Sequence, residues 1–293
     1  MHKYAIALPH QLIAMPEWRA ALGRARLRRI EFGCDDADVS AENIGEKVRL
    51  LAQMQDAGAA EVGSVHIPFG GGWEFADPDE SKRSRAAANT AAFIRACAPL
   101  HSPNFTLHGC LEPVPLAEPE RAAWRAAFRR TLEELVPVAA AQGARLNVED
   151  LPRSCLGNTA EELAAMVEGF PLETVGVCFD VNHLCGHPEK IAPGIKLLAP
   201  RVRALHISDY DGVDECHWYP GLGVIDWAAV MAAVRELPHD ALLIFECFGF
   251  IRAPQWQGRR VAPEVILRSY ERNAFYLENA AEIQRRIAAM PLD

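Results

Sequence analysis

The chain has 293 residues, of which half are apolar and 24% are charged, a composition typical of a globular protein with a full hydrophobic core. The formal net charge of −9 disfavours nucleic acid as a partner, because such binding depends on neutralising phosphates. The N-terminal apolar segment is too short for a signal-peptide core and no apolar run reaches membrane-spanning length, so we expect a cytoplasmic protein with no membrane partner.

Short apolar runs rich in β-branched residues alternate with long alanine-rich amphipathic segments along the chain. This alternation is typical of repeated βα units around a parallel sheet. Eight such units in a chain of this length predict an α/β fold, a single (β/α)8 TIM barrel over residues 1–293. The predicted strands are Tyr4 to Leu8, Arg29 to Gly33, Gly63 to Ile67, Asn104 to His108, Ala144 to Glu149, Val175 to Asp180, Val202 to Ile207 and Ala241 to Glu246.

The segments between these strands have apolar residues at helical spacing. Local signals agree with their limits: Thr159 and Glu162 form a capping box, Asp226 is a good N-cap, and Gly58 and Gly143 stand where helices should stop. The last of these segments, Pro263 to Met290, also offers a surface for a homo-oligomer. The predicted helices include Ala41 to Ala57, Ser81 to Cys97, Glu120 to Gln142, Thr159 to Glu168, Trp227 to Glu236 and Pro263 to Met290.

Polar residues close six of the predicted strands, although the strands are otherwise apolar. The carboxyl ends of all strands of a parallel barrel meet at one face, where active sites are built. Each residue alone has an ordinary structural interpretation, as a satisfied buried histidine or a carboxylate that caps a helix. Together they predict a cation, because clustered buried carboxylates would otherwise repel one another and lose hydration. The residues are His66, His108, Glu149, Asp180, His206 and Glu246, with His183 shortly after Asp180.

Four of these residues, on successive strands, offer three carboxylates and one imidazole: Glu149, Asp180, His206 and Glu246. This mixture of oxygen and nitrogen donors suits Mn²⁺, Mg²⁺ or Co²⁺ and also accepts Zn²⁺. The sequence therefore predicts a divalent metal ion as cofactor and leaves its identity open.

Two loops add candidate substrate contacts. The glycine-rich loop from Phe69 to Trp73 lacks the Lys-Ser/Thr of a P-loop, so we interpret it as an active-site loop in which Trp73 shields a small substrate. Ordinary packing is the alternative for Trp73. Arg252 lies in a basic segment after the eighth predicted strand, where barrels often bind phosphate. This segment would contact a sugar phosphate or form a subunit interface, and a solvated loop is the alternative.

The most specific parts of this pattern are Asp180-x-x-His183 and the run from His206 through His217 to Trp227. On these residues the chain resembles the xylose isomerase-like barrels, a group that includes sugar epimerases, hydroxypyruvate isomerase and apurinic-site endonucleases. The resemblance implies that the four strand-end residues hold the metal. It also implies that Glu149 and Glu246 form a catalytic acid/base pair that moves protons through a metal-stabilised enediolate, while His183 binds a substrate oxygen.

The resemblance leaves the reaction open. The arginine that ketose 3-epimerases carry before their Gly-x-x-Gly-x-Gly stretch is absent, and His217 occupies that neighbourhood. In an isomerase or epimerase of a sugar, sugar phosphate or keto acid, His66, His108 and His217 would contact the small-molecule substrate. In a phosphodiesterase like the endonucleases, these histidines and Glu215 would hold further zinc ions. The acidic charge favours the first function. A barrel that binds a ligand without catalysis is a third alternative.

Overall fold

The computed structural model describes residues 3–34, 39–110, 114–247 and 261–290. Eight parallel strands pair in chain order, and the eighth pairs with the first, so the sheet closes into a barrel. This confirms the predicted α/β barrel, and each strand ends within two residues of its predicted limits. The strands are β1 (Lys3–Pro9), β2 (Arg29–Gly33), β3 (Glu61–His66), β4 (Asn104–His108), β5 (Arg145–Glu149), β6 (Val175–Asp180), β7 (Val202–Ile207) and β8 (Leu242–Phe245).

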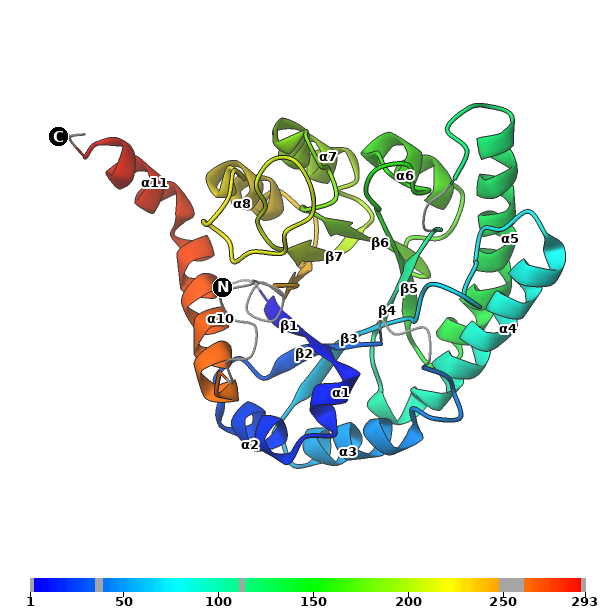
Figure 1. The fold of residues 1–293 in the computed structure, drawn as a ribbon, viewed down its shortest axis with the longest axis horizontal. Helices are drawn as coiled ribbons and strands as arrows, with labels where there is room; N and C mark the ends of the chain where they lie inside the picture. Colours follow the sequence, from blue (N-terminus) through cyan, green and yellow to red (C-terminus); the bar gives the residue numbers. More distant parts are fainter. Residues whose placement is uncertain (1–2, 35–38, 111–113, 248–260, 291–293) are drawn as a thin grey trace.

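Helices surround the strands as an outer ring (Figure 1). Their apolar residues recur every three or four positions and face the strands; in α3, for example, Val48, Leu51 and Met54 are buried. The helices are α1 (His10–Ile13), α2 (Pro16–Arg24), α3 (Gly45–Asp56), α4 (Glu80–Ala96), α5 (Glu120–Ala140), α6 (Ala160–Val167), α7 (Ile191–Leu197), α8 (Trp227–Arg235), α10 (Pro263–Glu278) and α11 (Ala280–Ala288), with short 3₁₀ turns at Ala98–Leu100 and Pro188–Lys190.

The predicted helix signals act as expected at most ends. The Thr159 hydroxyl accepts a hydrogen bond from the backbone N–H of Glu162, and the Asp226 carboxylate caps α8. Gly58 and Gly143 adopt φ values of 66° and 70°, a left-handed conformation that glycine adopts without strain. The predicted helix Ala41 to Ala57 begins later than expected, at the first residue of α3, because the four residues before it form a turn.

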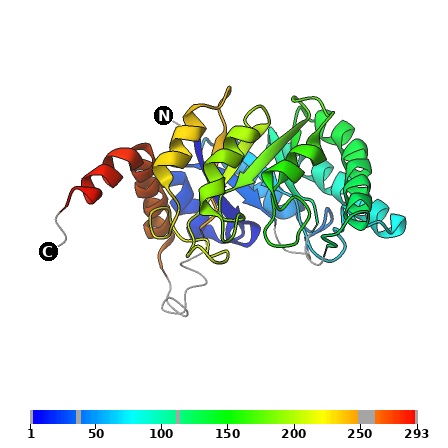
Figure 2. The same cartoon turned by 90° about the horizontal axis from the view of Figure 1, so that it is seen from above.

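The C-terminal stretch predicted as one helix is two. The helix α10 packs between α8 and α2 and completes the ring, whereas α11 begins after Asn279 and extends beyond it (Figures 1 and 2). Among the described residues, no helix combines the length and apolar character needed to cross a bilayer.

Small side chains fill much of the barrel interior. A cluster separate from the main core joins Ala5, Ala7, Cys178 and Ala204 with two larger residues of β8. Larger side chains at these positions would fill the space between opposite strands. The barrel therefore has room for polar side chains that reach across its interior.

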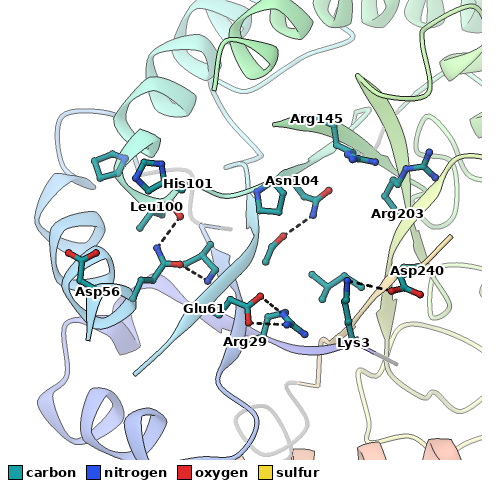
Figure 3. Close-up of a pocket in the computed structure, with 17 residues that line it drawn as sticks. Lys3, Arg29, Asp56, Glu61, Leu100, His101, Asn104, Arg145, Arg203 and Asp240 are labelled. Atoms are coloured by element: carbon teal, nitrogen blue, oxygen red, sulfur yellow. Dashed lines mark hydrogen bonds and ion pairs between the residues drawn. The ribbon is translucent and has the colours of Figure 1, made fainter. Parts of the chain in front are cut away.

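The amino ends of the strands surround a cavity of about 510 Å³ (Figure 3). Two ion pairs lie at this end, between Arg29 and Glu61 and between Lys3 and Asp240. The polar strand-end residues predicted as functional lie at the other end of the barrel.

Candidate metal centre

Four side chains converge at the carboxyl end of the barrel. Glu149 and Asp180 are the last residues of β5 and β6, His206 is the penultimate residue of β7, and Glu246 directly follows β8. One donor atom from each lies within 4.8 Å of all the others. The Nδ1 atom of His206 is 2.9 Å from Glu149 Oε1, 3.4 Å from Glu246 Oε2 and 3.9 Å from Asp180 Oδ2.

The surroundings of these donors fit a cation. Three carboxylates gather around one imidazole in a mostly buried space. Within the described part of the chain, Asp180 Oδ2 and Glu246 Oε2 are buried and have no hydrogen-bond partner. A buried carboxylate oxygen without a donor is costly, and a divalent ion removes that cost. Glu149, Asp180, His206 and Glu246 are therefore the residues that would hold it.

Two histidines from neighbouring strands contact the other oxygen of Glu149. Its Oε2 atom lies 3.1 Å from His66 Nε2 and 3.4 Å from His108 Nε2. His66 and His108 end β3 and β4 and are buried. Together with Glu149 they form a second group whose donor atoms lie within 4.8 Å of one another.

His183 and His217 lie beside further carboxylates of the cluster. His183 Nε2 is 3.4 Å from Asp180 Oδ2, and both histidines lie 3.6 Å from Glu215 Oε2. Arg153 forms an ion pair with the other oxygen of Glu215. His217 has a φ of 48°, a left-handed conformation that is uncommon for residues other than glycine and that clusters at functional sites. The four predicted histidines therefore all lie beside the carboxylates.

The two glutamates of the centre differ in proton affinity. Burial raises the pKa of Glu246 to about 7, and the charges of His206 and His217 only partly oppose this effect. Burial also acts to raise the pKa of Glu149, but the charges of His206 and His108 outweigh it and hold that pKa well below its usual value. Without a bound cation, the Glu246 carboxyl group therefore titrates near neutral pH, while Glu149 stays ionised.

The loop that carries Glu215 and His217 is organised around Asp209. The fully buried Asp209 carboxylate accepts hydrogen bonds from the backbone N–H groups of Tyr210, Gly221 and Ile225 and from the indole N–H of Trp227, at 2.8–3.2 Å. A Cβ at Gly223 would lie 2.1 Å from the Tyr210 carbonyl oxygen. These contacts explain physically why the run from His206 to Trp227 contains closely spaced glycines.

An aromatic ring does lie beside the histidines, but it is not the predicted one. Trp73 is buried against Phe75 and Phe93 in the hydrophobic core, which corrects the expectation that it faces a substrate. Phe69, at the start of the same loop, stacks on His108 with ring centroids 4.2 Å apart and meets His66 edge-on. Arg252 lies outside the described residues.

Two residues without an assigned role from sequence also belong to this region. Glu31, buried in β2, lies 2.8 Å from His206 Nε2. Asp150 is fully buried, accepts a hydrogen bond from the Asp180 backbone N–H, and has a pKa raised well above its usual value by burial. A charged residue inside an otherwise apolar strand or strand end was the available signal for both.

Comparisons with known proteins agree with this architecture. A family model described as xylose isomerase-like TIM barrel matches residues 22–266. The chain is 28% identical over 120 residues to an uncharacterised protein of Methanocaldococcus jannaschii, a match that covers 40% of this chain and 41% of that protein. The chain thus spans half or less of the length of the curated relatives it matches.

Solved structures resemble the chain over nearly its whole length. An L-ribulose 3-epimerase has a TM-score of 0.70 at 20% identity, covering 100% of both chains. The IOLI protein with a bound zinc atom has a TM-score of 0.73 at 15% identity, covering 95% of this chain and 98% of that one. Identities this low establish a shared fold. Because the family match includes every strand that carries a residue of the candidate centre, the chain belongs to the xylose isomerase-like TIM barrel family.

Proposed function

We propose that the protein is a divalent-metal-dependent isomerase or epimerase that acts on a small carbohydrate, sugar phosphate or keto acid. The observation that carries this proposal is the approach of Glu149 and Glu246 from separate strands to one cluster that fits a cation. Two carboxylate oxygens of this cluster have no hydrogen-bond donor among the residues that the structure describes. The fold shared with an L-ribulose 3-epimerase supports a carbohydrate as the substrate class.

The proposed chemistry is proton transfer at a carbon beside a carbonyl group. When bound, the metal ion supplies Lewis-acid polarisation of the substrate oxygens. Glu149 and Glu246 form the acid/base pair: one removes the carbon-bound proton, and the other returns a proton to the resulting enediolate.

The neighbouring side chains position and enclose the substrate in this proposal. His66, His108, His183 and His217 present ring nitrogens around the carboxylates and bind substrate hydroxyl or carbonyl oxygens. The Phe69 ring covers His108 and excludes water from the reacting carbon.

Solvent proton exchange tests the acid/base pair. We expect Glu149→Gln and Glu246→Gln each to abolish exchange of the substrate's carbon-bound proton with solvent, followed by NMR in deuterated buffer across a panel of ketoses, ketose phosphates and hydroxypyruvate. Glu61→Gln, at the opposite end of the barrel, is the matched control and should exchange at the wild-type rate. If Glu149→Gln or Glu246→Gln exchanges the proton at the wild-type rate, that glutamate is not a member of the acid/base pair.

A specific observation favours a second candidate, a phosphodiesterase with several zinc ions. His66 and His108 form an additional donor group with Glu149, and Glu215 lies between His183 and His217. These groups offer ligands for zinc ions that would bind a phosphate group and activate a water molecule. Metal analysis separates the candidates: one ion per chain supports the isomerase or epimerase. Three zinc ions per chain, with hydrolysis of bis(p-nitrophenyl) phosphate, would support the phosphodiesterase and overturn the first proposal.

A further inference from the structure

A buried glutamate on β2 reaches across the barrel interior to His206 on β7. Glu31 Oε1 lies 2.8 Å from His206 Nε2, and both residues are at most 1% exposed. The other carboxylate oxygen, Oε2, accepts a hydrogen bond from the Thr106 hydroxyl at 3.1 Å. The Thr106 oxygen is in turn 3.2 Å from the Ser64 hydroxyl. The Glu31 carboxylate therefore has a defined partner on each oxygen.

The local backbone explains how Glu31 reaches this position. The pairing of β2 with β3 shifts register between Ile30 and Glu31, an irregularity of the kind that re-aims side chains in sheets. On the other side, Glu31 pairs with Ala7 of β1, one of the small residues of the barrel interior. A larger side chain there would occupy the space through which the carboxylate reaches His206.

The two nitrogens of His206 face different surroundings. Nε2 contacts Glu31 alone among the carboxylates of the described residues, whereas Nδ1 faces the oxygens of Glu149, Glu246 and Asp180. A neutral imidazole carries one N–H donor and one acceptor nitrogen, and only the unprotonated nitrogen can bind a metal ion. The environment of Nε2 therefore determines which nitrogen of His206 is unprotonated and can bind a metal ion.

We infer that Glu31 is a positioning residue that accepts the Nε2–H of His206 and so holds Nδ1 unprotonated toward the cation. This inference rests on the metal centre of the proposed function and is independent of the reaction catalysed there. Carboxylates that accept the second N–H of a metal-binding histidine fix its tautomer and ring orientation, and their loss typically weakens metal binding by about 10–100-fold.

The test uses Zn²⁺ alone and reads both affinity and tautomer. In the Zn²⁺-loaded wild-type protein, ¹⁵N NMR of the histidine rings should show a proton on Nε2 of His206 and none on Nδ1. Glu31→Leu fills the space without an acceptor and should raise the Zn²⁺ dissociation constant by about 10–100-fold. Glu31→Gln keeps an acceptor oxygen and should restore both the tautomer and much of the affinity.

Thr106→Val is the matched control, because it removes the donor to Oε2 and leaves the contact of Oε1 with His206. It should keep the Nε2–H tautomer. A proton on Nδ1 in the loaded wild-type protein would overturn the inference, even if Glu31→Leu fails to fold. Wild-type Zn²⁺ affinity in a folded Glu31→Leu variant would do the same. If the wild-type protein binds no divalent ion, the metal centre of the proposed function also fails, so the two failures are distinguishable.

Discussion

Charged side chains have different partners at the two ends of the barrel. At the amino end, Arg29 donates two hydrogen bonds to Glu61, at 2.8 and 2.9 Å, and Lys3 pairs with Asp240 (Figure 3). At the carboxyl end, three carboxylates gather around the Nδ1 atom of His206, and two of their oxygens have no hydrogen-bond partner within the described part of the chain.

This difference supports placing the proposed active site at the carboxyl end of the barrel. The pairs at the amino end are complete within the chain and partly exposed, so each contributes little to stability. The carboxyl end collects buried carboxylate oxygens that a bound cation would stabilise. Three carboxylates differ in the partners that the described residues give them. Asp209 is buried and accepts four hydrogen bonds, Glu246 is largely buried and has one oxygen without a hydrogen-bond partner, and Glu61 is an exposed member of an ion pair.

Removing the well-satisfied carboxylate should have the largest effect. Asp209→Ala leaves four N–H donors, three of them buried, without their acceptor, and we expect the free energy of unfolding to fall by about 3–5 kcal/mol. Urea unfolding measures this change. The matched control is Asp226→Ala, which removes only the cap of α8 and should cost about 1 kcal/mol. Equal losses in the two variants would show that Asp209 does not organise the loop.

Removing the Glu246 carboxylate, whose Oε2 atom has no hydrogen-bond partner among the described residues, should instead raise the free energy of unfolding. The pKa of Glu246 is about 7 in the folded protein and lies near 4.5 when the residue is exposed, so between these values the folded state keeps a proton that the unfolded state has released. The contribution of Glu246 to stability therefore falls as pH rises through this window.

In excess chelator, Glu246→Gln should consequently be more stable than the wild-type protein by about 1–3 kcal/mol at pH 8, and the difference should shrink toward pH 4.5. Thermal unfolding of both proteins across this pH range provides the measurement. A wild-type protein more stable than the variant at pH 8, or a difference independent of pH, would contradict the claim that burial of the Glu246 carboxylate destabilises the metal-free protein.

Removing the exposed carboxylate should have the smallest effect. Glu61→Gln weakens a partly exposed ion pair with Arg29, and we expect the free energy of unfolding to change by less than about 1 kcal/mol. Divalent-metal affinity should stay at the wild-type value, which isothermal titration calorimetry can establish. A marked loss of metal affinity would mean that the amino end influences the cluster, and the contrast between the two ends would fail.

The sequence predicts the barrel and the four strand-end residues because both depend on local patterns. Strand limits follow from apolar runs, and the closing residues Glu149 and Asp180 sit where such runs end. The aromatic contact depends instead on tertiary packing: Trp73 and Phe69 lie in one loop, and nothing local distinguishes the core-facing ring from the one that stacks on His108.

The roles of Glu31 and Asp209 are not predicted from sequence because their partners are distant in the chain. Glu31 stands out in sequence as a charged residue between Ile30 and Phe32, but its partner His206 is 175 residues away. Three of the four donors to Asp209, on Gly221, Ile225 and Trp227, likewise reach it only when the following loop folds back on β7. Sequence patterns indicate that such residues need a partner, and only the folded chain identifies it.

Metal binding by the wild-type protein and one matched pair of variants tests the central claim most directly. After removal of bound metal with chelator, titration with Mn²⁺ and Zn²⁺ should show at least one ion bound per chain. Asp180→Ala, which removes one candidate ligand, should weaken binding by more than about 100-fold, beyond the range expected for supporting residues, whereas Glu61→Gln should bind as the wild type does. Absence of divalent-ion binding, or equal affinity in Asp180→Ala and the wild-type protein, would contradict a metal centre at the carboxyl end of the barrel.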